Sequence, residues 1–301
     1  MTNNKGFIFL GDRIKLLMEE QEVQLIQDYY LKKANRQQVE FIKNTTGNIS
    51  FFSMNYELIK GEEDDNVRYY HTENFEDWNY WIVEHNESQS RFNIKLALLL
   101  STSDLFSLFE KLPKLVSMYQ QFSYSNFIAE NTTRANYEFK EISQTNIIEI
   151  QDIYNLLEQF NKVEYTYIAK ALDDYYQLRN IPNQSPFYIL GMFSILEALL
   201  VHKGQVSITH QIKTKLNLLN NRFEDPINFS EFFGDVRYEK VIAKLYEYRS
   251  DIAHGDFADF NGDLKVLVKF DHVSKVIHKI LKTTLKQALK EPQLFKDLKN
   301  C

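Results

Sequence analysis

The segment LYEYRSDIAHG, residues 245–255, places Arg249, Ser250, Asp251 and His254 within about one and a half turns of an expected helix. An arginine guanidinium matches phosphate oxygens with several N–H donors and keeps its positive charge. A histidine can accept and donate a proton near neutral pH, which suits general acid–base catalysis. The combination is typical of a site that acts on a phosphate ester. The alternative is a surface arginine followed by a histidine that caps a helix.

Gly255 predicts where this helix ends. Glycine often adopts the left-handed conformation that terminates a helix, so we expect His254 in the last helical turn. Carbonyl dipoles at that end favour a protonated imidazole. The same dipoles repel phosphate, so Arg249 or a partner chain must supply the compensating positive charge.

Glu197 is the only formally charged residue between Asn180 and His202, and it lies in the apolar segment SILEALLV. An ionised carboxylate in such a helix is costly unless it is paired. Arg249 is the best placed cation on another predicted helix, so we expect an ion pair between these two residues. The alternative is that Glu197 lies on a thin exposed stripe with Ser194.

Three segments in this order resemble the HEPN superfamily, and most closely the ApeA-like HEPN group of bacterial defence proteins. They are the SILEALL helix with Glu197, the amphipathic ITHQIKTKLNLL helix and the ending LYEYRSDIAHG. The resemblance covers residues 144–301, about half of the chain. In many active members Asn, Asp or His directly follows the arginine, whereas here Ser250 does, with Asp251 next.

The resemblance implies a metal-independent endoribonuclease and a bacterial anti-phage defence effector or toxin. Arg249 and His254 match the family's catalytic pair, with Glu197, Ser250 and Asp251 as supporting residues. A homodimer would bring two copies of the helix together around one cleft that binds RNA. Products would be a 2′,3′-cyclic phosphate and a 5′-hydroxyl. A second hypothesis, favoured by Ser250 and the acidic net charge, is a non-catalytic HEPN module for dimerisation or partner binding.

A row of lysines near the C-terminus is a candidate RNA-binding surface. Helical spacing puts these lysines on one face of a predicted helix, and two lysines of another helix could extend that face. Such a surface could follow a phosphate backbone. The alternative is an ordinary solvated helix face. The residues are Lys275, Lys279, Lys282, Lys286 and Lys290, extended by Lys213 and Lys215.

Composition limits the classes of protein that fit this chain. It has 301 residues, 44% of them hydrophobic, nine glycines and five prolines, which favours long regular elements. The net charge of −6 means that the chain as a whole repels nucleic acid, whereas residues 261–301 carry nine basic and four acidic side chains. No secretory signal pattern, membrane span, phosphate-binding glycine loop or metal-spaced cluster stands out. We therefore expect a cytoplasmic protein without metal or cofactor, a location that the single cysteine, Cys301, also favours.

The pattern of elements divides the chain into a mixed α+β domain, residues 1–143, and an all-α domain, residues 144–301. The first domain contains no recognisable chemistry, and we expect it to sense an unknown trigger or regulatory partner. In it the pattern predicts helices at 13–31 and 103–121 and strands at 39–42, 49–58, 67–71 and 78–83. In the second domain it predicts helices at 147–160, 163–178, 187–201, 206–219, 236–254 and 272–289.

Overall fold

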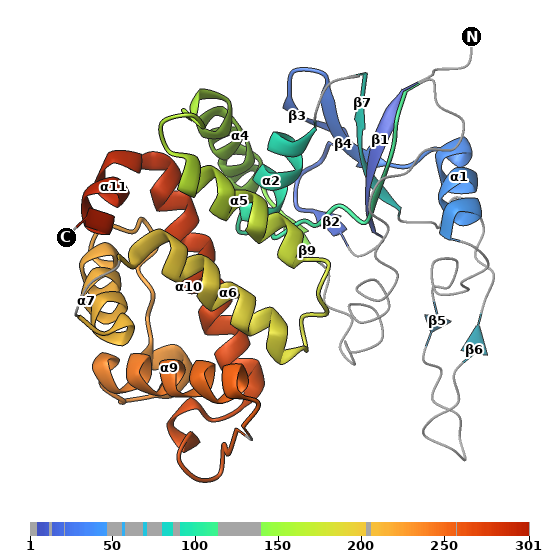
Figure 1. Ribbon diagram of the computed structural model, residues 1–301. Coiled ribbons are helices and arrows are strands. Elements are labelled where there is room, and N and C mark those ends of the chain that lie inside the picture. Colours follow the sequence, from blue (N-terminus) through green and yellow to red (C-terminus); the bar gives the residue numbers. More distant parts are fainter. Residues whose placement is uncertain are drawn as a thin grey trace. The chain divides into compact units, whose positions relative to one another are not determined.

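The computed structural model divides the chain into two compact units, Met1–Tyr154 and Asn155–Cys301 (Figure 1). The expected order of an α+β region followed by a helical region is confirmed. We expected the second domain to begin at residue 144, which is the first residue of helix α4 (Gln144–Gln159), whereas the units divide inside that helix. The structure describes residues 5–11, 14–20, 22–46, 56–57, 69–70, 80–86, 91–113, 140–202, 206–256 and 258–300.

An antiparallel sheet of five strands forms the centre of the first unit, in the order β3-β4-β7-β1-β8. β3 and β4 form a hairpin with a two-residue turn, in which Asp28 has the left-handed φ of 66° that such turns require. The strands are β1 (Gly6–Gly11), β3 (Glu22–Ile26), β4 (Tyr29–Lys33), β7 (Trp81–His85) and β8 (Phe109–Lys111).

Two short ladders accompany the main sheet. β2 (Ile14–Leu16) pairs in parallel with β9 (Lys140–Ile142), and β5 (Tyr56–Glu57) pairs antiparallel with β6 (Tyr69–Tyr70). The described helices that lie wholly within this unit are α1 (Arg36–Thr46) and α2 (Phe92–Leu100).

The strand register gives the main sheet two distinct faces. Phe7 of β1 is opposite Glu84 of β7 on one side and Lys111 of β8 on the other, so these three side chains share a face. Helix α1 packs on this face, because the Phe41 ring lies 5.8 Å from the Phe7 ring and 6.4 Å from the Phe109 ring. These aromatic contacts fix α1 against the sheet.

The other face carries a buried charged cluster. His85 and Glu110 come from β7 and β8 and belong to this face by strand alternation. Glu110 Oε2 accepts a hydrogen bond from Lys95 Nζ at 3.2 Å, and its Oε1 lies 3.6 Å from His85 Nε2. Arg91 also pairs with Glu110. Arg91 directly precedes α2 and Lys95 lies within it, so the start of α2 is held to β8 by charge.

The second unit is a helical bundle organised around α6, which contacts α5, α7, α9, α10 and α11. Its long helices confirm the helical pattern predicted from residue 144 onward. The elements are α5 (Thr166–Leu178), α6 (Pro186–Leu200), α7 (Ile208–Asn220), α8 (Ser230–Phe233), α9 (Tyr238–His254), the 3₁₀ turn η3 (Lys265–Leu267), α10 (Phe270–Lys290) and α11 (Pro292–Asn300).

Local sequence explains where α6 begins and how closely it packs. Ser185 caps the helix, with its Oγ accepting a hydrogen bond from Phe187 N at 3.3 Å, and Pro186 occupies the first turn as predicted. Gly191 permits the close approach of α5, because a Cβ there would lie 2.4 Å from Leu178 Cδ1. A larger residue at position 191 would therefore displace the Leu178 side chain.

Three predictions in the first unit are wrong. Residues 13–31, predicted as a helix, contribute β2, β3 and part of β4, and the described part of 103–121 contains β8 and no helix. Residues 39–42, predicted as a strand, lie in α1. The strand predicted at 78–83 is confirmed as β7, shifted by a few residues. Of 49–58 and 67–71, only the short strands β5 and β6 lie within the described residues.

Candidate active site

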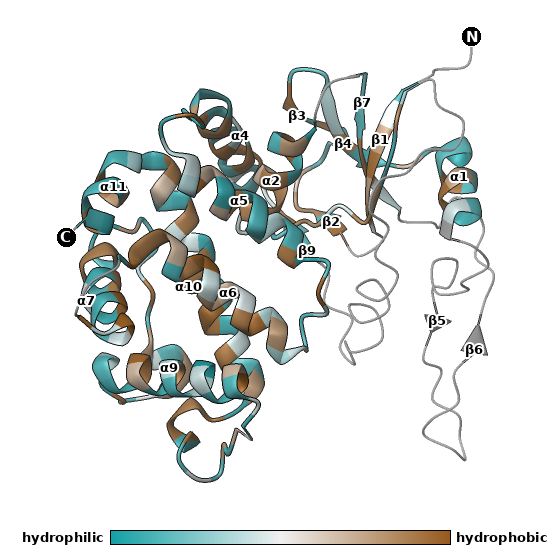
Figure 2. Ribbon diagram, viewed as in Figure 1, coloured by the Kyte–Doolittle hydropathy of each residue, from teal (hydrophilic) through white to brown (hydrophobic). Residues whose placement is uncertain are grey.

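Helices α6 and α9 pack together and carry the residues singled out in the sequence. Hydrophobic and hydrophilic residues alternate around α9 (Figure 2), and its apolar side is buried. Burial of that side orients the polar side outward, so the polar residues at the C-terminal half of α9 lie at or near the surface. The buried residues of α9 are Val241, Ile242, Leu245, Tyr246 and Tyr248.

The expected ion pair between Arg249 and Glu197 is present. Arg249 Nε lies 3.1 Å from Glu197 Oε1, and Nη2 lies 3.2 Å from Oε2, which makes the contact bidentate. The Arg249 side chain is 29% exposed and the Glu197 side chain 17%. Ser194 is exposed, as the alternative interpretation supposed, but Glu197 turns from that stripe towards α9. The pair is therefore accessible from one side and shielded on the other.

Tyr246 is a residue of this site that the sequence analysis missed. It lies one turn before Arg249 on the same side of α9, so the i,i+3 spacing was the available signal. Burial raises the pKa of Tyr246 well above its usual value; the Glu197 charge raises it further and the Arg249 charge lowers it. Its ring packs edge-on against Phe193 at 5.2 Å. Its buried hydroxyl has no hydrogen-bond partner among the described residues.

His254 occupies the last turn of α9, and Gly255 ends the helix in the left-handed conformation with φ of 78°, as predicted. Gly255 N donates to Ile252 O at 3.2 Å, and Asp256 N donates to Asp251 O at 2.8 Å, which satisfies two carbonyls of the last turn. The His254 side chain is exposed and makes no hydrogen bond or ion pair with another described residue. Its imidazole is therefore open to solvent and to a substrate.

Within one chain, the structure does not bring Arg249 and His254 together. Five residues along a helix correspond to a rotation of roughly 140° and a rise of about 7.5 Å, so the two side chains leave α9 in different directions. The guanidinium is held at α6, whereas the imidazole lies at the helix end. A single copy therefore does not direct the two groups towards one point.

Ser250 and Asp251 are both partly buried between these two residues. Burial raises the pKa of Asp251, and the neighbouring carboxylates of Glu247, Asp256 and Asp263 raise it further. The C-terminal end of α9 is therefore acidic. A phosphate bound there requires positive charge beyond what the surrounding side chains provide, as the direction of the helix dipole predicts.

Lys215 does not belong to an RNA-binding surface. It is buried, and its Nζ donates to Leu200 O at 2.9 Å and lies 3.3 Å from His202 Nδ1. The last carbonyls of α6 lack partners within the helix, so an ammonium group placed there is stabilised by hydrogen bonding and by the helix dipole. Lys213, on the same helix α7, is partly exposed.

The predicted lysine row lies on α10, and part of its charge is compensated within the chain. Lys279 Nζ lies 3.3 Å from Asp225 Oδ2, and Lys290 pairs with Glu224. Lys275 is exposed, while Lys282 and Lys286 are partly buried. The acidic segment before α8 therefore neutralises two positions of the row.

No described cluster of three or more histidine, cysteine, aspartate or glutamate side chains could hold a metal ion. None of the helices that the structure describes has the length and apolar character needed to cross a bilayer. No family model, curated protein or solved structure matches this chain.

Proposed function

We propose that this chain is a metal-independent endoribonuclease of the HEPN type, with its active site built by two copies of α9. The observation that carries the proposal is the partly exposed, bidentate Arg249–Glu197 pair, together with an exposed His254 at the end of the helix that carries Arg249. The carboxylate fixes the guanidinium plane while part of it remains open to solvent. Positioned N–H donors of this kind stabilise developing charge on a phosphate.

The reaction uses a nucleophile that RNA itself supplies. The ribose 2′-oxygen attacks the adjacent phosphorus, an O2′–P bond forms, and the P–O5′ bond breaks. The His254 imidazole accepts the 2′-hydroxyl proton and then donates it to the departing 5′-oxygen. Arg249 stabilises the additional negative charge on the phosphorane oxygens. Because the 2′-oxygen stays on phosphorus, the products are a 2′,3′-cyclic phosphate and a 5′-hydroxyl.

A second copy of the chain explains how groups that diverge on one helix can act on one phosphate. In a two-fold dimer, Arg249 of one copy can face the partner subunit's His254 across the shared cleft. Two arginines would also bring the guanidinium donors that Glu197 does not use to the acidic end of α9. The dimer is therefore part of the proposal, because without it Arg249 and His254 do not face the same phosphate.

The first prediction tests catalysis directly. We expect the Arg249→Ala and His254→Ala variants each to lose at least about 100-fold in RNA cleavage rate, because each removes a group that acts only in the transition state. Purified wild-type chain should cleave transfer RNA or total RNA in the presence of EDTA. The measurement is gel analysis of the fragments with end-group determination. His210→Ala, which removes an exposed histidine on α7, is the matched control and should cleave as the wild type does.

Cleavage that persists at the wild-type rate in both variants would contradict the proposal. So would fragments with 5′-phosphate ends, because transfer to the 2′-oxygen cannot produce them. Equal melting temperatures of His254→Ala and wild type are required to assign a loss of activity to chemistry.

A second candidate function is a non-catalytic HEPN module for dimerisation or partner binding. Two observations favour it. Glu197 already occupies the Nε and Nη2 donors of Arg249, and acidic side chains that repel phosphate surround Asp251. Such a module would form the dimer and show no RNA product under any condition, with or without divalent cations. Light scattering and the cleavage assay separate the two functions.

As a ribonuclease, the protein would act in the cytoplasm as an anti-phage defence effector or toxin. Lys213, Lys275, Lys282 and Lys286 are then candidates for contacts with the RNA backbone. The first unit would respond to a trigger or a regulatory partner and so control the nuclease.

A further inference from the structure

A cavity of about 210 Å³ lies in the first unit between the sheet and helix α1. Its lining comes from four strands or their ends and from the first turns of α1, which are distant in sequence. Register places the strand residues on the face that α1 covers, so the cavity is a product of the fold. The lining residues are Lys5, Phe7, Lys32, Asn35, Gln37, Gln38, Phe41, Glu84 and Lys111.

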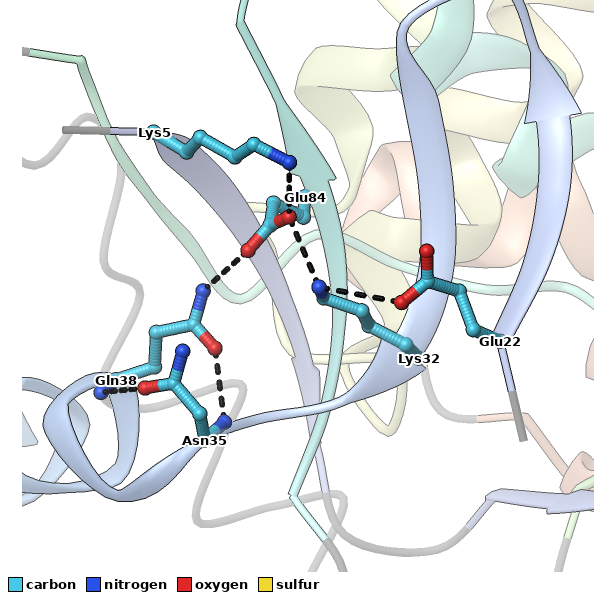
Figure 3. A network of polar contacts seen from close by, with 6 residues as sticks. All are labelled: Lys5, Glu22, Lys32, Asn35, Gln38 and Glu84. Carbon is cyan, nitrogen blue, oxygen red and sulfur yellow. Dashed lines mark hydrogen bonds and ion pairs between the residues drawn. The ribbon is translucent and has the colours of Figure 1, made fainter. Parts of the chain in front are cut away.

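Glu84 organises two of the lysines in this cavity (Figure 3). Its Oε1 accepts hydrogen bonds from Lys5 Nζ at 2.8 Å and Lys32 Nζ at 2.9 Å, and its Oε2 accepts one from Gln38 Nε2 at 2.9 Å. The hydrogen bonds from both lysines and from Gln38 hold the pKa of Glu84 below its usual value, against the opposing effect of burial. The carboxylate is thus ionised, and both of its oxygens are engaged.

The two lysines keep donors that Glu84 does not use. An ammonium group has three N–H donors. Lys5 gives one of them to Glu84, and Lys32 gives one to Glu84 and pairs with Glu22 at 3.3 Å. The remaining donors are held near the cavity by a buried carboxylate, which reduces the conformational entropy lost when a ligand binds.

Lys111 adds a third positive charge to the lining. Its Nζ lies 5.3 Å from the centre of the Phe41 ring, and it forms no ion pair with any residue that the structure describes. The lining therefore carries three lysines against one glutamate. This excess is local, because the chain as a whole has a net charge of −6.

The start of α1 contributes further to the positive potential. Asn35 and Gln38 cap it reciprocally, with Gln38 N donating to Asn35 Oδ1 at 3.0 Å and Asn35 N donating to Gln38 Oε1 at 2.8 Å. Both residues line the cavity, so the helix presents its positive dipole end there. The helix end supplements the lysines, which carry the main attraction.

We propose that this cavity binds a small phosphate-bearing anion, either inorganic phosphate or the phosphate group of a nucleotide. A cavity of 210 Å³ equals the volume of about seven water molecules, which suits a phosphate group and excludes a folded polymer. Counting Glu22, which pairs with Lys32, one positive charge remains in excess, which favours an anion. The half-buried Phe41 offers an apolar wall beside the charged end. The site concerns the first unit alone and does not depend on the proposed ribonuclease activity.

Isothermal titration of the full chain with sodium phosphate, and separately with adenosine monophosphate, tests this site at constant ionic strength. We expect one ligand to bind per chain, and Lys111→Gln to weaken binding at least about tenfold, because it removes the cation without a described acidic partner. The matched control is Lys33→Gln. Lys33 is exposed and adjacent to Lys32 on β4, so its side chain points to the opposite face of the sheet.

The two ligands distinguish the source of the phosphate. Tighter binding of the nucleotide identifies it as the ligand class, whereas binding of inorganic phosphate alone identifies the free ion. Absence of binding by both would overturn the proposal, as would an equal loss in Lys33→Gln and Lys111→Gln. Lys5→Gln provides a second variant, in which Glu84 keeps Lys32 and Gln38, and it should weaken binding in the same direction.

Discussion

At the scale of single residues, the candidate active site depends on the ion pair that Glu197 forms with Arg249. Glu197 is costly in an apolar helix unless a cation faces it, and Arg249 meets that requirement through two hydrogen bonds. The same contact limits the arginine, since a phosphate must compete with the carboxylate or use the remaining guanidinium donors. The pair therefore keeps the arginine in place before substrate binds, and a substrate must share it.

Tyr246→Phe is the second prediction about this site. Since the buried hydroxyl has no described hydrogen-bond partner, its removal should leave the free energy of unfolding unchanged or raise it by up to about 1 kcal/mol. Tyr175→Phe is the matched control, because the Tyr175 hydroxyl lies 3.0 Å from His278 Nε2 and its loss should cost about 1 kcal/mol. Urea unfolding of both variants measures the difference. A clear loss of stability in Tyr246→Phe would show that the hydroxyl is partnered.

At the scale of elements, α2 is attached to the sheet by charges that are almost fully buried. Glu110 is 1% exposed, and Arg91, Lys95 and His85 surround it. Removing one member of such a cluster leaves an uncompensated buried charge, which typically costs several kcal/mol. The start of α2 is therefore determined by electrostatics as much as by its apolar residues.

Stability should depend on pH through Lys95. Burial, together with the nearby Arg91 charge, lowers the pKa of Lys95 to about 8, although its ammonium contacts Glu110. The unfolded chain keeps this proton up to about pH 10.5, so above pH 8 the unfolded state binds more protons than the folded state. The free energy of unfolding therefore increases with pH because of Lys95, by up to about 2 kcal/mol between pH 8 and 9.5.

Urea unfolding of wild type and Lys95→Met across this range measures the effect. The variant has no proton to lose at this position, so its stability should rise less steeply than that of the wild type. Lys33→Met removes an exposed lysine of β4 and should retain the wild-type slope. Parallel curves for wild type and Lys95→Met would show that Lys95 keeps its proton in the folded chain.

At the scale of the whole molecule, the proposed activity is a property of two chains. Arg249 and His254 diverge on α9, and the acidic end of that helix needs external positive charge. The basic C-terminal segment does not supply all of it, since Lys279 and Lys290 are paired within the chain. An arginine from a second subunit would face His254 and would also bring guanidinium donors to the acidic end of α9.

Mixing two inactive variants tests this arrangement. In an equimolar mixture of Arg249→Ala and His254→Ala, half of the dimers are mixed, and each mixed dimer keeps one of its two arginine–histidine pairs intact. We therefore expect the mixture to recover roughly a quarter of wild-type RNA cleavage. The cleavage rate is measured after co-refolding or co-expression, with light scattering as the control for dimer formation. A mixture as inactive as each variant would show that the arginine and histidine of one copy act together.

Much of the second unit follows from the sequence, because helical periodicity, Pro186 and Gly255 are local signals. The same periodicity misled the prediction at residues 13–31, where apolar residues at helical spacing belong to strands. Strands are stabilised by partners from distant segments, so β-sheet pairing overrides a local pattern. At residues 39–42 the error is the opposite one, because β-branched and aromatic residues predicted a strand and the segment forms part of helix α1.

The sequence by itself determined the identity of the charged residues on the two helices, the end of α9 and the need of Glu197 for a partner. These depend on local conformation and on the cost of an isolated charge in an apolar segment. Only the tertiary structure decided that Lys215 is buried and that Tyr246 lies close to the charges of Glu197 and Arg249. It also decided that three lysines, Lys5, Lys32 and Lys111, line one cavity. Each of these depends on which distant segments pack together, and a pattern along the chain contains no distance between them.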